Sequence, residues 1–205
     1  MAVSPLYAPF KRGMDIAGAL TIGVAGWPLM LGAAAAVRVS MGSPVLFTQE
    51  RAGRDGASFR IYKFRTMREA FDASGQPLPD AERITRVGHF LRKTSLDELP
   101  QFLNVLRGEM SLIGPRPLPV RYLGRYTPEQ ARRHEVRPGI TGWAQVQGRS
   151  SVAWESKFQY DVWYVDHVSL LTDVKILAMT VFKVAGGSDT FGVGNEEFMG
   201  TQATL

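Results

Sequence analysis

The stretch IAGALTIGVAGWPLMLGAAAAV, residues 16–37, decides the fold because none of its 22 residues is charged. As an α-helix, about twenty apolar residues span the roughly 30 Å hydrocarbon core of a bilayer. A buried core helix rarely runs this long. A secretory signal fits poorly, because the run is long for one and Asp15 stands at its entrance. Two interpretations remain: a helix that crosses the membrane, or one that enters and leaves by the same face.

Two features of the run favour the second, re-entrant interpretation. Pro28 follows Trp27 near the middle, and proline removes a backbone donor and bends or breaks a helix. Positive charge marks the cytoplasmic side of a membrane segment, and here it lies on both flanks. The basic residues are Lys11 and Arg12 before the run and Arg38, Arg51, Arg54, Arg60, Lys63 and Arg65 after it. We therefore predict a monotopic membrane protein with a helix broken at Pro28 and both ends in the cytoplasm.

Composition narrows the functions open to the rest of the chain. The 205 residues contain no cysteine, which excludes a disulfide scaffold, a thiolate zinc site and a cysteine nucleophile. His89, His134 and His167 lie far apart, so a histidine-rich metal site is not expected. The net charge of +5 indicates an anionic partner: phosphate, nucleic acid or an acidic membrane surface.

Local patterns predict an α+β, mostly helical fold. Residues 44–49 and 59–67 have the composition of strands, and the Asp55-Gly56 pair between them favours a small β-hairpin. Thr127 to Gln130 has the capping-box pattern that starts a helix. Further helices are expected over a segment with leucines on one face (Leu96, Leu99, Leu103, Leu106), over 154–167 and over 173–185.

We divide the chain into three parts on this basis. Residues 1–40 form the membrane-embedded re-entrant helix, residues 41–187 a cytoplasmic domain, and residues 188–205 a C-terminal tail. The apolar residues 176–184 fit an amphipathic interfacial helix in the headgroup plane and a core helix equally well.

Asp97 and Glu98 stand at the start of the leucine-faced helix and have two interpretations. Ser95 to Glu98 fits a capping box. With Asp97 as the cap instead, Pro100 falls at the third helical position, where no hydrogen bond is lost. Acidic residues in a first turn also suit the helix dipole. Spacing alone therefore leaves capping and catalysis both open.

The neighbouring residues favour a catalytic role for Asp97 and Glu98 over capping. Arg92 and Lys93 come just before it, and the stiff turn Gly114-Pro115-Arg116-Pro117 follows soon after. Arginine forks match phosphate oxygens, and a helix N-terminus attracts anions and keeps a carboxylate ionised. Adjacent carboxylates among arginines, without cysteine, are typical of magnesium and phosphate chemistry.

Six blocks of sequence follow one another along residues 11–183. They are Lys11-Arg12 with Asp15, PVLFTQER (44–51), YKFRTM (62–67), SLDELPQ (95–101), MSLIGPRP (110–117) and RPGITGWAQV (137–146). In these blocks the chain resembles the bacterial sugar transferase family of monotopic phosphoglycosyl transferases, and its length resembles the minimal members.

The resemblance implies a Mg²⁺-dependent enzyme at the cytoplasmic face of the bacterial inner membrane. It would transfer a sugar phosphate from a UDP-sugar to polyprenol (undecaprenyl) phosphate and release UMP, the first membrane step of glycoconjugate assembly. Asp97 matches the nucleophile and Glu98 its partner for proton handling, both near the metal. Residues that match positions near the phosphates, or a later acidic position of open role, are Lys63, Arg65, Arg92, Arg116, Arg137, Arg149 and Asp173.

Departures from the family leave some points open. Trp27-Pro28 replaces a common Ser-Pro, and Gln147-Gly148-Arg149-Ser150 replaces Asn-Gly-Arg-Asn. The sugar is therefore open, although residues 154–166 favour an N-acetylated amino sugar. A homo-oligomer is open too.

Two classes compete with the enzyme. A nucleic-acid-binding protein would need a basic stripe with stacking aromatics, which the sequence lacks. A non-catalytic anchor for anionic inner-membrane lipids would not need Asp97-Glu98 or the Gly-Pro-Arg-Pro turn.

Overall fold

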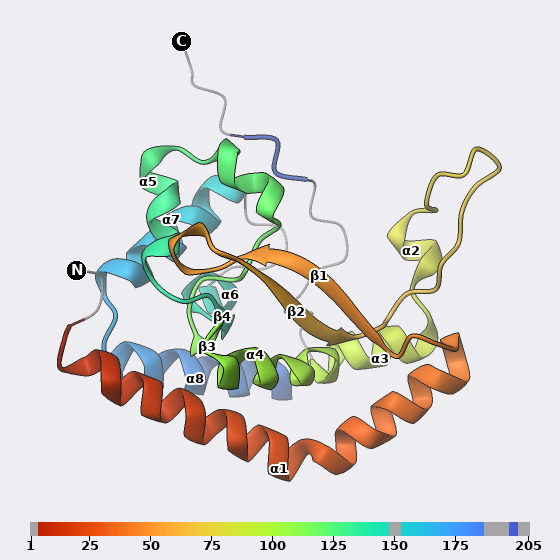
Figure 1. The fold of residues 1–205 in the computed structure, drawn as a ribbon, viewed down its shortest axis with the longest axis horizontal. Helices are drawn as coiled ribbons and strands as arrows, with labels where there is room; N and C mark the ends of the chain where they lie inside the picture. Colours follow the sequence, from red (N-terminus) through yellow and green to blue (C-terminus); the bar gives the residue numbers. More distant parts are fainter. Residues whose placement is uncertain (1–3, 148–152, 187–196, 201–205) are drawn as a thin grey trace.

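The computed structural model describes residues 4–147, 153–186 and 197–200, and in them the chain is mostly helical, as predicted (Figure 1). It has two small sheets, the predicted hairpin and a parallel pair of strands that was not predicted. With η for 3₁₀ helices, the elements are α1 (Tyr7–Met41), β1 (Leu46–Ala52), η1 (Arg54–Gly56), β2 (Ser58–Phe64), α2 (Asp80–Arg83), α3 (Arg86–Lys93), η2 (Leu96–Gln101), α4 (Phe102–Arg107), β3 (Ser111–Ile113), η3 (Val120–Arg125), α5 (Pro128–Ala131), η4 (Arg132–Glu135), β4 (Gly139–Thr141), α6 (Trp143–Gln147), α7 (Trp154–Asp166) and α8 (Leu170–Ala185).

Helix α1 is longer than the charge-free run, at 35 residues, and contains Pro28. Among the described residues it is the one helix long and apolar enough to cross a membrane. Figure 1 shows it bent near its middle, with both arms rising toward the same side of the molecule. Proline removes the hydrogen bond to the carbonyl four residues earlier and its ring clashes there, which accounts for a bend.

Both arms of α1 pack against one domain. In the first arm Ala19 is fully buried beside Val105 of α4, and in the second arm Val37 is fully buried beside Phe64 of β2. Small residues allow this close approach: a Cβ atom at Gly23 would lie 2.8 Å from the ring of Phe102. Ala19 and Val37, near the two ends of the charge-free run, therefore both lie against the same domain.

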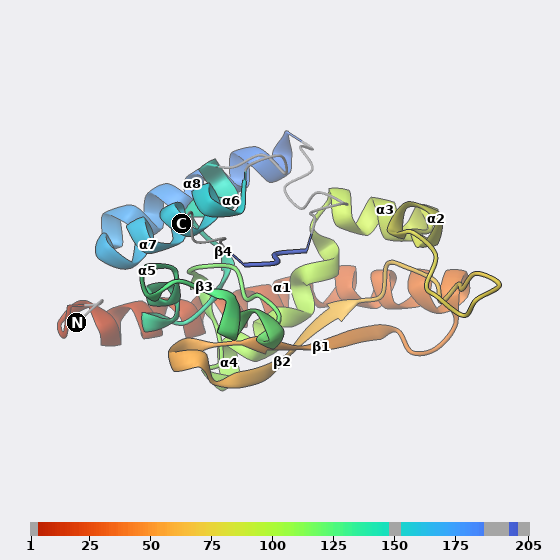
Figure 2. The ribbon, with the colours of Figure 1, turned by 90° about the horizontal axis from the view of Figure 1, so that it is seen from above.

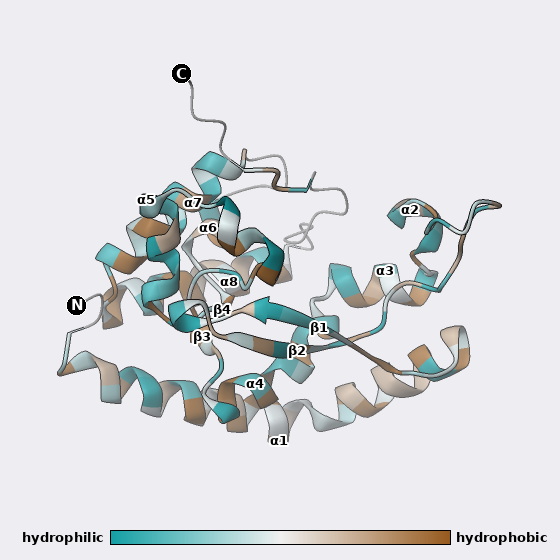
Figure 3. Cartoon of the chain, turned by 45° about the horizontal axis from the view of Figure 1, so that its top comes forward, coloured by the Kyte–Doolittle hydropathy of each residue, from teal (hydrophilic) through white to brown (hydrophobic). Residues whose placement is uncertain are grey.

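The outward side of α1 stays apolar and uncovered. Val24 is 73% exposed, and Leu103 of α4 and several large apolar residues of α8 are exposed too. Figure 3 shows hydrophobic residues along α1. Monomeric soluble proteins rarely expose such a surface, so it marks contact with lipid or with another protein.

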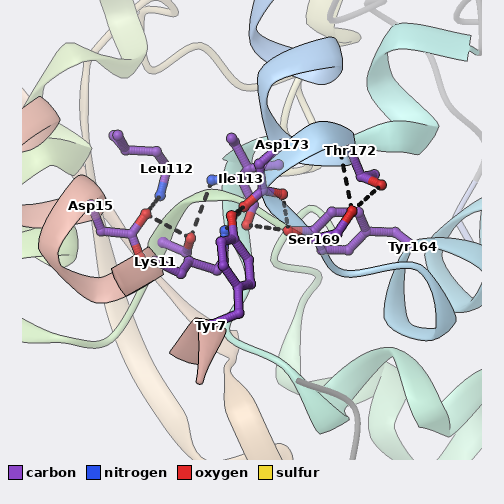
Figure 4. A network of polar contacts seen from close by, with 10 residues as sticks. Tyr7, Lys11, Asp15, Leu112, Ile113, Tyr164, Ser169, Thr172 and Asp173 are labelled. Atoms are coloured by element: carbon purple, nitrogen blue, oxygen red, sulfur yellow. Dashed lines mark hydrogen bonds and ion pairs between the residues drawn. The ribbon is translucent and has the colours of Figure 1, made fainter. Parts of the chain in front are cut away.

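The basic residues before the run hold α1 to the domain. Arg12 donates to the carbonyls of Val105 (2.7 Å) and Leu106 (3.1 Å), at the end of α4. Lys11 Nζ lies 2.6 Å from the carboxylate of Asp173, which also accepts from the hydroxyls of Tyr7 and Tyr164, each at 2.7 Å (Figure 4). This network joins the start of α1 to α7 and α8.

Asp15 makes a second connection between α1 and the domain. Its Oδ1 accepts from the hydroxyl of Ser111 at 2.8 Å and from the backbone N of Leu112 at 2.9 Å, at the start of β3 (Figure 4). A buried carboxylate at the entrance of an apolar run thus receives its hydrogen bonds from the domain.

The predicted hairpin is present with shifted ends. β1 and β2 pair antiparallel from Leu46 opposite Phe64 to Ala52 opposite Ser58. Asp55 and Gly56 have positive φ angles of 55° and 75°, which Asp-Gly turns favour.

The capping box at Thr127 is also confirmed, with the Thr127 hydroxyl accepting from the backbone N of Gln130.

A parallel pair of short strands, β3 and β4, joins two of the sequence blocks. The backbones behind them touch so closely that a Cβ atom at Gly139 would lie 2.1 Å from the backbone N of Gly114, and one at Gly142 would lie 2.1 Å from the Gly114 carbonyl oxygen. Glycine is required at these positions because any side chain would clash with backbone. The contact fixes the turn that carries Arg116.

Part of the predicted tail is packed on the domain. Phe198 is only 2% exposed and lies among Tyr122, Tyr126 and Phe158. Its backbone N donates to the Tyr122 hydroxyl at 3.2 Å. The described residues 197–200 of the region 188–205 are therefore anchored.

Candidate active site

Asp97 and Glu98 lie in η2, where the chain crosses over α1 between α3 and α4 (Figure 2). Neither predicted capping arrangement occurs. Ser95 precedes η2 in a left-handed conformation (φ 56°) and makes no side-chain capping bond, and Asp97 lies inside the 3₁₀ helix instead of at its start. The pair is therefore free for a role other than capping.

The most deeply buried side chains of this segment include polar ones. Asp97 and Glu98 are 7% and 3% exposed, whereas Leu103 is 37% exposed. Asn104, which is fully buried, fastens α4 to β2 by accepting from the Tyr62 backbone N and donating to the Arg60 carbonyl. The polar side chains therefore point into the domain, Leu96 and Leu106 pack against core clusters, and Leu103 is exposed.

Glu98 is held by two cations. Its Oε1 accepts from Lys63 Nζ at 2.5 Å and from Arg116 at 2.9 Å. Burial by itself would raise the pKa of Glu98, but the attraction of Arg116 and Lys63 outweighs it and lowers that pKa to about 2. A carboxylate held by Lys63 and Arg116 in this way is a weak proton acceptor.

Asp97 has the opposite environment. Its Oδ1 is buried and has no hydrogen-bond partner among the described residues. Burial and the neighbouring Glu98 charge raise the pKa of Asp97 to about 6, while Lys63, Arg116 and Arg92 act in the other direction. We expected the helix dipole and cations to favour the charged form, and burial overrides them. The carboxylate is still mostly ionised at neutral pH, and it is poorly solvated.

Further cations surround the pair. Arg92 Nε donates to the Thr66 hydroxyl at 3.0 Å, and its charge reaches Asp97. Arg51, which the sequence marked only as flanking charge, lies close enough to Arg116 that burial and this like charge lower its pKa to about 10. Burial and Arg116 also lower the pKa of Lys157. A surplus of positive charge facing a single carboxylate pair suits a polyanionic ligand.

Other predicted phosphate residues lie elsewhere. Arg65 donates to the Met41 carbonyl at the end of α1, and Arg137 donates to the Gly108 carbonyl at 2.8 Å, so each of them stabilises a helix end. Asp173 is fully buried in the network with Lys11. Arg149 lies outside the described residues.

The carboxylates of the site suit a magnesium ion. The described residues contain no cluster of three or more acidic or histidine side chains that would form a complete protein cage. Mg²⁺ does not need one, because it keeps several waters and commonly binds through one or two carboxylates plus substrate phosphates. The unpartnered Oδ1 of Asp97 is a hard oxygen ligand of this kind, so the residues fit the ion.

The amino-acid sequence matches one protein family over most of its length. The sequence model of the bacterial sugar transferase family matches residues 6–187, nearly the whole chain. The chain belongs to the bacterial sugar transferase family. The matched residues include α1, the Asp97–Glu98 pair and the turn at Arg116.

Relatives within this family differ in length. The chain is 50% identical over 194 residues to the uncharacterized sugar transferase EpsL of Bacillus subtilis, covering 93% of this chain and 96% of EpsL. It is 43% identical over 192 residues to a UDP-N-acetylgalactosamine-undecaprenyl-phosphate N-acetylgalactosaminephosphotransferase of Aeromonas hydrophila, covering 90% of this chain and 45% of the relative. It is 42% identical over 183 residues to a UDP-glucose:undecaprenyl-phosphate glucose-1-phosphate transferase of Escherichia coli, covering 84% of this chain and 39% of that relative. The chain thus spans less than half the length of the latter two sugar transferases.

Proposed function

We propose that this sugar transferase moves a sugar phosphate from a UDP-sugar to undecaprenyl phosphate, giving undecaprenyl diphosphate sugar and UMP, as an early membrane step of glycoconjugate assembly. The observation that supports it best is the pair of environments in η2: an unpartnered buried carboxylate, Asp97, next to a carboxylate clamped by Lys63 and Arg116. The names of the Aeromonas and Escherichia relatives describe the same reaction class.

The reaction proceeds in two displacements at one phosphorus. An oxygen of Asp97 attacks the β-phosphorus of the UDP-sugar, the bond from that phosphorus to the bridging oxygen breaks, and UMP leaves. A phosphate oxygen of undecaprenyl phosphate then attacks the same phosphorus, the bond to Asp97 breaks, and the carboxylate is restored. Two displacements with a positioned, weakly solvated nucleophile replace one difficult step.

The cations of the site balance the charge of the diphosphate. Lys63 and Arg116 hold Glu98 ionised beside the reacting phosphate, and Arg92 and Arg51 extend the positive surface. Asp97 and Glu98 would hold Mg²⁺, which when bound offsets charge on the phosphates. Glu98 acts in this proposal as a fixed negative charge that orders the two cations, not as a base.

The proposed location is the inner leaflet of the bacterial cytoplasmic membrane. With both arms of α1 packed on one domain, the helix would enter and leave the bilayer from the cytoplasmic side, with Val24 and Trp27 in the lipid. This monotopic arrangement sets η2 at the membrane surface, where a soluble UDP-sugar and a lipid-anchored acceptor can both reach it.

The experiment is a single-turnover assay in nanodiscs with Mg²⁺ and a panel of UDP-sugars, without lipid acceptor. The wild type should release about one equivalent of UMP and keep the sugar phosphate on Asp97, which mass spectrometry of the intact protein detects. Asp97→Asn should abolish both the burst and turnover. It should melt no lower than the wild type, because it removes a poorly solvated charge.

Asp55→Asn is the matched control, since Asp55 is exposed in the hairpin turn and asparagine also adopts its left-handed conformation. It should keep the full burst. A folded Asp97→Asn protein with substantial turnover would rule out the covalent route. A protein that binds anionic vesicles and releases no UMP from any donor would be the non-catalytic anchor.

A further inference from the structure

An apolar groove lies directly beside the candidate active site. It has a volume of about 350 Å³ and is formed by the second arm of α1, the hairpin and the segment from η2 into α4. Every residue that lines it is apolar; six that define its walls are Trp27, Leu31, Ala34, Phe64, Pro100 and Leu103. Its volume is within the range of sites that bind small molecules.

The groove and the site share two walls. On β2, Lys63 donates to Glu98, and the next residue, Phe64, lines the groove from the other face of the strand, so β2 is a wall between the site and the groove. On η2, Pro100 lines the groove three residues after Asp97. A ligand with a charged head and an apolar tail could therefore place its head at Asp97 while its tail follows the groove.

The third wall of the groove belongs to the surface proposed to lie in lipid. Trp27 and Leu31 of α1 are 56% and 59% exposed while they also line the groove. The groove is thus continuous with the uncovered apolar face of α1. A tail lying in it would continue into the bilayer without crossing water.

We infer that this groove binds the part of the isoprenoid chain next to the phosphate of the acceptor lipid. The inference rests on the proposed function, which supplies an acceptor with a phosphate head and a polyprenyl tail. A UDP-sugar is polar along its length and would lose hydrogen bonds in a groove without polar groups. The volume holds only the first units of a long polyprenyl chain, so the remainder stays in the membrane.

Filling the groove tests this inference. Ala34→Phe places a ring in the groove, and Ala35→Phe, one residue later on the exposed side of the same helix, is the matched control. We expect Ala34→Phe to lower kcat/KM for undecaprenyl phosphate at least tenfold, and Ala35→Phe to change it less than twofold. The UMP burst without acceptor should persist in both, which shows that the donor half of the site is folded. Wild-type kcat/KM for the acceptor in Ala34→Phe would overturn the inference.

A second measurement does not depend on catalysis. An undecaprenyl phosphate analogue with a diazirine on its first isoprene units should crosslink the wild-type protein at residues 27–34 and 100–103 and lose most of that labelling in Ala34→Phe. A phosphatidylglycerol with a diazirine in its acyl chain should label these residues much less. Equal labelling by both lipids would mean that the groove takes any bilayer chain, and the inference would be wrong. Absence of a burst, by contrast, would contradict the proposed function and leave the crosslinking result to decide the groove.

Discussion

Asp97 and Glu98 follow one another in the chain, yet the protein moves the pKa values of their carboxyl groups in opposite directions, to about 6 and about 2. Burial acts on both. The difference comes first from charge: the attraction of Arg116 and Lys63, which also donate hydrogen bonds to Glu98, lowers the pKa of Glu98, whereas the Glu98 charge adds to burial in raising the pKa of Asp97, whose Oδ1 has no partner among the described residues. Separated pKa values of this kind give two like groups different tasks in one site.

The first prediction concerns pH. If Asp97 must be ionised to attack, the rate of the UMP burst should fall as the pH drops through about 6, by up to tenfold per unit. Glu98→Gln removes a negative charge that raises the pKa of Asp97, so the remaining activity should lose its acid sensitivity at a lower pH. Rates measured from pH 5 to 8 at one Mg²⁺ concentration decide this. A shift of the acid limb to higher pH in Glu98→Gln would contradict the assignment.

The second prediction concerns the arginine fork. Arg116 reaches Glu98 at 2.9 Å from a turn fixed by the contact of Gly114 with Gly139. Arg116→Lys keeps the charge and loses the planar pair of donors, so kcat should fall tenfold or more, about 1.4 kcal/mol. Arg121→Lys, at an exposed arginine of η3, is the control and should change kcat little. Near wild-type kcat in Arg116→Lys would make Arg116 a structural or lipid-binding residue.

The third prediction concerns topology. The chain has no cysteine, so Ser4→Cys and Ser74→Cys each introduce a single reporter at an exposed position. A membrane-impermeant thiol reagent should label neither in intact cells and both after permeabilisation. Adding Pro28→Ala restores a continuous helix and should make a fraction of the Ser4→Cys protein accessible from outside. Strong outside labelling at position 4 with Pro28 present would show a full span instead.

The fourth prediction separates structure from substrate binding at Asp173. The carboxylate is fully buried against Lys11, and removing one member of a buried ion pair costs about 3–5 kcal/mol. Asp173→Asn and Lys11→Met should each lower the melting temperature in detergent, and the double variant should lose much less than their sum. An Asp173→Asn protein with normal melting and a raised KM for the UDP-sugar would instead support the phosphate role implied by the family resemblance.

The fifth prediction concerns the C-terminal segment. Phe198 is buried in an aromatic cluster and its neighbour Met199 is 76% exposed. Phe198→Ala should cost about 3–5 kcal/mol of unfolding free energy, and Met199→Ala should cost little. Thermal melting of the two variants measures this. Equal melting temperatures would mean that residues 197–200 contribute nothing to stability.

The sequence by itself determined the features that depend on neighbouring residues. The apolar run with Pro28 gives a long helix with a bend, the Asp55-Gly56 pair gives the hairpin turn, and the Thr127 box starts α5, because each follows from residues a few positions apart. The six sequence blocks, in their order along the chain, were also enough to identify the family.

Only the tertiary structure decided which side chains of the site meet. Glu98 accepts hydrogen bonds from Lys63 and Arg116, which are 35 and 18 residues away in the chain. Lys11 donates to Asp173 across 162 residues. No local pattern encodes such partners. Capping by Ser95 or Asp97 was a local prediction that failed, because the polar side chains gain more from charges brought in by β2 and the Arg116 turn.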